Sequence, residues 1–174
     1  MKRVIVMACL TIAFQSTAQA QNNAIGTSWS FSGIGITYER NVSEDAFAQV
    51  SLQAEMAETF IGRALHPGLS AAFSWNLVFA QIESRNDNQV RFYAGPGLAA
   101  GIGQDIKTPP GLFVGLKGRL GMQGIFNRRV NISAALAPVL GIYVSKQDEY
   151  INARAYRHGL LRAFMPEVGI SYRF

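Results

Sequence analysis

The chain has 174 residues, of which 49 % are apolar, 16 % charged and 11 % aromatic, and its formal net charge is +5. Charge this sparse excludes an intrinsically disordered chain, which needs low hydrophobicity and high charge. After the N-terminus the sequence has no apolar run of about 18 residues, which excludes a helical membrane bundle. A soluble β-rich domain and a membrane β-barrel remain.

Residues 1–20 have the pattern of a secretory signal peptide. Lys2 and Arg3 precede an apolar stretch from Val4 to Phe14, and Ala18 and Ala20 give the small-residue cleavage pattern. We therefore expect a signal peptide at 1–20 and a single mature domain at 21–174. Removing Lys2 and Arg3 lowers the net charge from +5 to +3 (5 − 2), so the basic charge gives little support to nucleic-acid binding. We expect no nucleic-acid partner and no cofactor.

Apolar and polar residues alternate with a period of two through most of the mature sequence. This alternation predicts β-strands, and they are longer than the usual five to six residues or so. Seven strands are clear, at 28–40, 46–58, 69–79, 90–102, 112–126, 130–144 and in a last segment that ends at 174. Alternation slips near Ser32 and Gly33, which we interpret as a β-bulge in the first strand.

Short connections alternate with long ones along the chain, as in transmembrane barrels. One strand face is almost uncharged, while the other carries small and sparsely charged polar residues that suit a narrow lumen. The sequence therefore predicts an all-β protein, an antiparallel up-and-down transmembrane barrel. Bacterial barrels of one chain have an even strand number. We expect eight strands, with the eighth in residues 21–32 or in a hairpin within 145–163.

The C-terminal segment GISYRF places Tyr172 and the terminal Phe174 on the apolar face. With the signal peptide, long alternating strands and unequal connections, the chain resembles the small outer-membrane β-barrel proteins of the outer membrane protein A type. The resemblance implies location in the outer membrane of a Gram-negative cell. It also implies that Tyr172 and Phe174 form an assembly signal read by the barrel-assembly machinery.

Seven charged residues fall on the predicted lumen face: Glu39, Glu55, Arg91, Lys117, Arg119, Glu167 and Arg173. Opposite charges in a narrow lumen are expected to pair, because an unpaired buried charge costs several kcal/mol. The favoured interpretation is a salt-bridge network that largely closes the lumen of a monomeric barrel with a structural or interaction role. The alternative is a narrow, gated pore or transporter.

The long connection from Lys146 to Arg162 contains candidate surface contacts: Arg154, Tyr156, Arg157 and His158. Arginine and tyrosine suit phosphate and sugar groups, so lipopolysaccharide and other outer-membrane lipids are candidate partners. A solvated loop without a ligand is the alternative. A lipid-A-modifying enzyme is a further alternative, since His158 could act with Ser145, Asp148 or Glu149. The spacing supports no catalytic set, and no metal site is expected.

Overall fold

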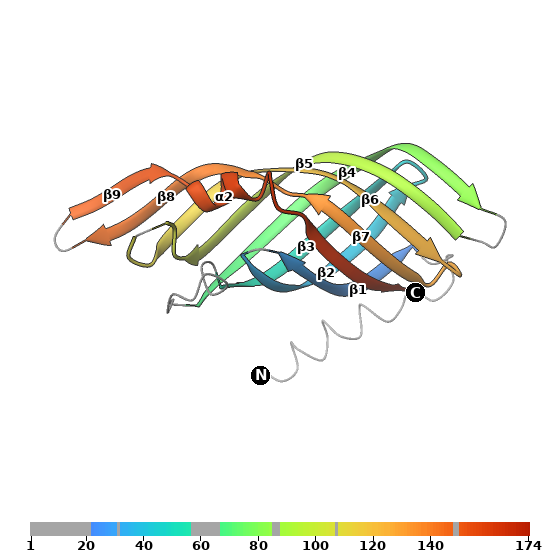
Figure 1. Ribbon diagram of the computed structural model, residues 1–174, viewed down its shortest axis with the longest axis horizontal. Helices are drawn as coiled ribbons and strands as arrows, with labels where there is room; N and C mark the ends of the chain where they lie inside the picture. Colours follow the sequence, from blue (N-terminus) through green and yellow to red (C-terminus); the bar gives the residue numbers. More distant parts are fainter. Residues whose placement is uncertain (1–21, 31, 57–66, 85–87, 107, 148–149) are drawn as a thin grey trace, which may run out of the picture.

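The computed structural model describes residues 22–30, 32–56, 67–84, 88–106, 108–147 and 150–174. They form one antiparallel sheet that closes on itself (Figure 1). The strands are β1 (Asn23–Ser30), β2 (Gly33–Ser43), β3 (Ala46–Glu55), β4 (Gly68–Ser84), β5 (Asn88–Gly103), β6 (Gly111–Phe126), β7 (Val130–Leu136), β8 (Val139–Gln147), β9 (Tyr150–Ala155) and β10 (Glu167–Arg173). A short helix, α2 (Arg157–Leu161), separates β9 from β10.

These ten segments make eight barrel strands. β7 and β8 both pair with β6 and form one wall strand, broken at Ala137 and Pro138. β9 and β10 form the last wall strand, which α2 interrupts. β1 pairs with β10 from Ala24–Arg173 to Trp29–Val168 and closes the barrel. The predicted fold class, an antiparallel barrel of eight strands, is confirmed.

The eighth strand is β1, within the range 21–32 in which it was expected. β1 and β2 form a hairpin around Ser32, so the predicted bulge at Ser32 and Gly33 was wrong. Alternation slips there because the chain turns back, and not because a continuous strand carries an extra residue. The predicted strand at 130–144 is also divided, since Pro138 has no backbone N–H for the ladder.

The β2–β3 and β6–β7 turns lie at one end of the barrel together with the C-terminus, while Ser32 of the β1–β2 turn and the extensions of β8 and β9 lie at the other end (Figure 1). We call these the short-turn end and the long-loop end. Asn127 and Arg128 in the β6–β7 turn have φ angles of 48° and 59°. Two successive residues with positive φ match the twist of an antiparallel hairpin.

Large apolar side chains cover the outside of the barrel. One row of paired residues passes from strand to strand around the wall: Ile25, Tyr38, Val50, Phe73, Leu98, Leu116 and Leu140. Every member of this row is exposed, and Leu116 reaches 65 %. Polar groups such as Gln49, Asn76 and Gln123 are buried inside. An apolar outside around a polar inside is the pattern of a barrel in a membrane. Within the described residues, no helix is long and apolar enough to cross a membrane.

The apolar row predicts how the wall responds to charge. Leu116→Arg is expected to lower the free energy of unfolding by about 2–4 kcal/mol in lipid, because its guanidinium would face the hydrocarbon. Urea titration of the barrel in vesicles, followed by heat-modifiable gel mobility, measures this change. Tyr150→Arg is the control, since Tyr150 is 80 % exposed in the β9 extension. Equal stability of the two variants would contradict a lipid-facing position for Leu116.

Candidate functional site

The middle of the lumen contains a buried three-residue ion cluster. Lys117 and Arg119 lie two positions apart on β6, so both side chains point inward, and Glu167 begins β10. Lys117 Nζ lies 3.8 Å from Glu167 Oε2, and Arg119 Nη2 lies 3.4 Å from Glu167 Oε1. All three side chains are at most 8 % exposed. One carboxylate therefore faces two cations across the barrel.

Glycines on β5 are the neighbours of the two cluster residues of β6. Gly95 is paired with Arg119, and Gly97 is paired with Lys117. A Cβ atom at Gly95 would collide with the carbonyl oxygen of Trp75, so only glycine fits where β4 and β5 approach this closely. The Arg119 guanidinium lies 5.3 Å from the ring centre of Tyr93, a cation–π distance.

A second buried ion pair lies nearer the long-loop end. Arg162 Nη2 donates to both carboxylate oxygens of Glu55, at 2.8 Å to Oε1 and 2.7 Å to Oε2. The Ser70 hydroxyl also donates to Glu55. The Arg162 side chain is only 8 % exposed, so the Glu55 carboxylate supplies the counter-charge for a guanidinium that lies inside the barrel.

Aromatic side chains fill the long-loop end of the lumen. The Phe113 and Tyr156 rings stack with centres 4.3 Å apart, and the Tyr143 ring lies 6.2 Å from Tyr156. The Tyr143 hydroxyl donates its one proton to the Pro109 carbonyl at 2.6 Å, with the Gly103 carbonyl 3.0 Å away as a second acceptor that shares it. These bonds fix the β5–β6 connection against β8.

Asp105 attaches the same connection to α2. Its fully buried carboxylate accepts the backbone N–H of Arg157 at 3.2 Å and that of His158 at 2.8 Å. Arg154 Nη2 lies 3.4 Å from it. His158 Nδ1 lies 2.9 Å from the Gln104 carbonyl, a distance that fits a donated hydrogen bond. Asp105 thus caps a helix that is 52 residues further along the chain.

The predicted surface contacts divide into two groups. Arg157 is exposed, and the Arg154 side chain is 27 % exposed. Tyr156 and His158 are only 3 % and 2 % exposed, so the prediction that they form surface contacts was wrong for these two residues. The helical turn of α2 directs them inward, against the aromatic stack and Asp105. Of the candidate enzyme residues, Ser145 is buried, and Asp148 and Glu149 lie outside the described residues.

The predicted lumen charges are not one continuous network. Lys117, Arg119 and Glu167 come together, while Glu55 pairs with Arg162, which sequence reasoning had placed in the surface loop. Glu39 accepts hydrogen bonds from Gln123 at 2.9 Å and Asn131 at 3.2 Å.

At the short-turn end, Arg91 Nε donates to Gln89 Oε1 at 2.8 Å. Neither Arg91 nor Arg173 forms an ion pair with another described residue. The described residues also contain no group of three or more potential metal ligands.

The last strand carries its aromatics on the outside. Tyr172 and Phe174 are 50 % and 49 % exposed, and Tyr172 pairs with Ile25 and Val130. Phe174 exchanges backbone hydrogen bonds with Asn23. The terminal aromatic therefore lies at the closing seam, at the short-turn end. Its recognition by the assembly machinery stays a prediction.

The fold matches a known class of barrel. The N-terminal β-barrel domain of Pseudomonas aeruginosa OprF is similar over 90 % of this chain and 100 % of that domain, with a TM-score of 0.54 and 13 % identity. Ail, the attachment invasion locus protein of Yersinia pestis, aligns over 87 % of this chain and 93 % of its own, with a TM-score of 0.34 and 14 % identity. No family model and no curated protein matches the sequence. The chain has the fold of the small outer-membrane barrels of the outer membrane protein A type.

Proposed function

We propose that this protein is an integral outer-membrane barrel whose lumen is closed by its own side chains, and that it has a structural or interaction role without catalysis. The observation that carries this proposal is the buried cluster of Lys117, Arg119 and Glu167 in the middle of the lumen. Glu55 with Arg162 adds a second obstruction nearer the long-loop end. Buried, mutually paired charges leave little free charge to attract a passing ion.

The proposal includes an orientation. The short-turn end faces the periplasm and the long-loop end faces the outside, as in other transmembrane barrels. Residues 1–20 direct export, the mature chain begins at Gln21, and the assembly machinery reads Tyr172 and Phe174. Mass spectrometry of the protein from outer-membrane fractions tests the processing site. Recovery of the protein from the soluble periplasmic fraction would contradict the proposed location.

The long-loop end is the proposed interaction surface. Arg157 is exposed there, and Tyr150 and Ile151 project from β9 with 80 % and 78 % exposure. Exposed basic, apolar and aromatic groups at the same end of the barrel suit anionic lipid headgroups such as those of lipopolysaccharide. The protein acts there as a monomer. Unchanged lipid A mass in cells with and without the gene is expected if the barrel does not modify lipid.

Conductance separates the closed barrel from the narrow pore. The purified protein in planar bilayers is expected to give no ion-conducting steps, because both ion pairs and the aromatic stack cross the lumen. Heat-modifiable mobility of the same sample shows that the barrel is folded, and a general porin reconstituted in parallel shows that the assay detects channels. Regular conductance steps from folded protein would replace the proposed role with that of a pore.

A further inference from the structure

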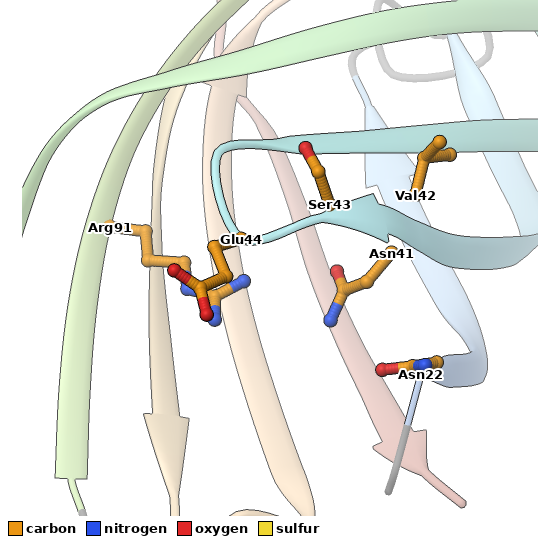
Figure 2. Close-up of a pocket in the computed structure, with 6 residues that line it drawn as sticks. All are labelled: Asn22, Asn41, Val42, Ser43, Glu44 and Arg91. Atoms are coloured by element: carbon orange, nitrogen blue, oxygen red, sulfur yellow. The ribbon is translucent and has the colours of Figure 1, made fainter. Parts of the chain in front are cut away.

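A polar pocket of about 320 Å³ lies at the short-turn end of the barrel (Figure 2). It is lined by Asn22, Asn41, Val42, Ser43, Glu44 and Arg91. Its volume lies near the lower end of the range for small-molecule sites, roughly 300–1,000 Å³. The pocket is separate from the two ion clusters and the aromatic stack, so the lumen-closing interactions leave it unexplained.

A β-bulge in β2 shapes this pocket. Asn41 pairs with Phe47 and Ser43 pairs with Ala46, so Val42 is an extra residue without a partner on β3. Val42 is 54 % exposed, on the same outward-facing side of β2 as Tyr38 and Arg40, and it forms the rim of the pocket. The Asn41 backbone N–H donates to the Asn22 carbonyl at 2.7 Å and holds that residue beside the bulge. Bulges are common next to binding sites, because they redirect side chains locally.

Arg91 presents an oriented guanidinium to the pocket. Its Nε is bound to Gln89, which leaves both terminal nitrogens without a hydrogen bond or ion pair to another described residue. In Figure 2 the side chain reaches from β5 toward Glu44 in the β2–β3 turn. Two parallel N–H groups match the two oxygens of a carboxylate. The two terminal N–H groups of Arg91, which we call the Arg91 fork, are therefore available to bind an anionic ligand group.

Glu44 makes a purely anionic ligand unfavourable. Its carboxylate lines the same pocket and forms no ion pair with a described residue. Asp45 lies next to it in the turn, which adds a second negative charge. A ligand with both charges is attracted by Arg91 through its negative group and by Glu44 through its positive group. A simple anion is attracted by Arg91 but repelled by Glu44. The amides of Asn22 and Asn41 can both donate and accept, as a peptide group requires.

We propose that this pocket binds a small zwitterion, an amino acid or a dipeptide. The ligand carboxylate binds Arg91 and its ammonium group lies near Glu44; in a dipeptide, the peptide group also contacts Asn22 and Asn41. This inference goes beyond the proposed function, because binding at this end requires neither a closed lumen nor a surface partner. With the short-turn end in the periplasm, the ligand class is that of free amino acids and short peptides of that compartment.

Titration of ¹⁵N-labelled protein in lipid nanodiscs with alanyl-alanine tests the site. Saturable shifts are expected at the amides of Asn22, Asn41 and Ser43. Acetyl-alanyl-alanine lacks the ammonium group and alanyl-alanine amide lacks the carboxylate, so each is expected to bind about tenfold more weakly or worse. Arg91→Gln and Glu44→Gln are each expected to lower the affinity for alanyl-alanine by a similar factor. Arg129→Gln, at the same end but outside the pocket, is expected to bind like the wild type.

Three results would overturn the proposal. The first is the absence of saturable shifts in protein whose spectrum shows a folded barrel. The second is equal binding of the blocked and unblocked peptides, because the pocket would then not recognise both charges. The third is unchanged affinity of the Arg91→Gln variant. Since the spectrum reports folding directly, a misfolded variant is recognised, and Arg91→Lys then replaces it as a variant that keeps the charge but loses the fork.

Discussion

Glu167→Gln is expected to lower the free energy of unfolding by about 3–5 kcal/mol, the cost of removing one partner from a buried ion pair. Glu167 is the carboxylate that faces both Lys117 and Arg119, and the three side chains are almost completely buried. The neutral amide would leave two adjacent buried cations without a counter-charge. Urea titration in vesicles, followed by heat-modifiable mobility, measures the loss.

Two further variants make this test specific. Glu83→Gln is the matched control, because Glu83 is an exposed carboxylate bound only to Gln81 and Gln89 among the described contacts, and its loss should cost less than about 0.5 kcal/mol. Adding Lys117→Met to Glu167→Gln is expected to restore part of the stability by removing one unpaired charge. A stable Glu167→Gln variant with increased conductance would instead indicate a gated pore.

Arg162→Met is expected to cost about as much, again about 3–5 kcal/mol, because Glu55 would lose the cation that both of its oxygens contact. The same substitution is expected to loosen α2 as well as the ion pair. Arg162 follows α2 directly, so its loss also releases one of the attachments of the helical turn to the barrel wall. Faster hydrogen exchange at the Tyr156 amide, which donates to the Gly141 carbonyl at 2.9 Å, would report this release.

Arg157→Met is the control for this second experiment. Arg157 lies in the same helical turn but is exposed, so its replacement should leave stability within about 0.5 kcal/mol. The double variant Glu55→Gln/Arg162→Met is expected to be more stable than Arg162→Met alone, since no buried carboxylate remains unpaired. If Arg157→Met and Arg162→Met were equally stable, Glu55 would not depend on Arg162.

Period-two alternation predicted most of the wall and the direction of its side chains. Lys117, Arg119 and Glu167 lie within regular strands, where the alternation determines which face a side chain is on, and all three are buried inside the barrel. The same rule fails where the chain leaves the strand conformation. The helical turn after Tyr156 reverses which residues point inward, so His158 and Arg162 could not be placed from their positions in the sequence.

Asp105 shows a different limit of sequence reasoning. It is one acidic residue in a connection, and nothing nearby indicates that it will be fully buried. Its partners are backbone N–H groups 52 and 53 residues further along the chain, which any residue other than proline would provide at those positions. The β1–β2 hairpin was missed for a related reason. Its connection is so short that the alternation resumes almost at once, and the turn resembles a bulge.

The closing seam determines when this barrel can become stable. β1 and β10 are the first and last strands, and Ala24 pairs with Arg173 across almost the whole described chain. Glu55 and Arg162, which hold the last wall strand from inside, are 107 residues apart. Contacts of such long sequence separation form late, because closing the intervening loop costs entropy. A chain without β10 would leave two unpaired sheet edges in the membrane, so the barrel is expected to fold as one cooperative unit with no stable half.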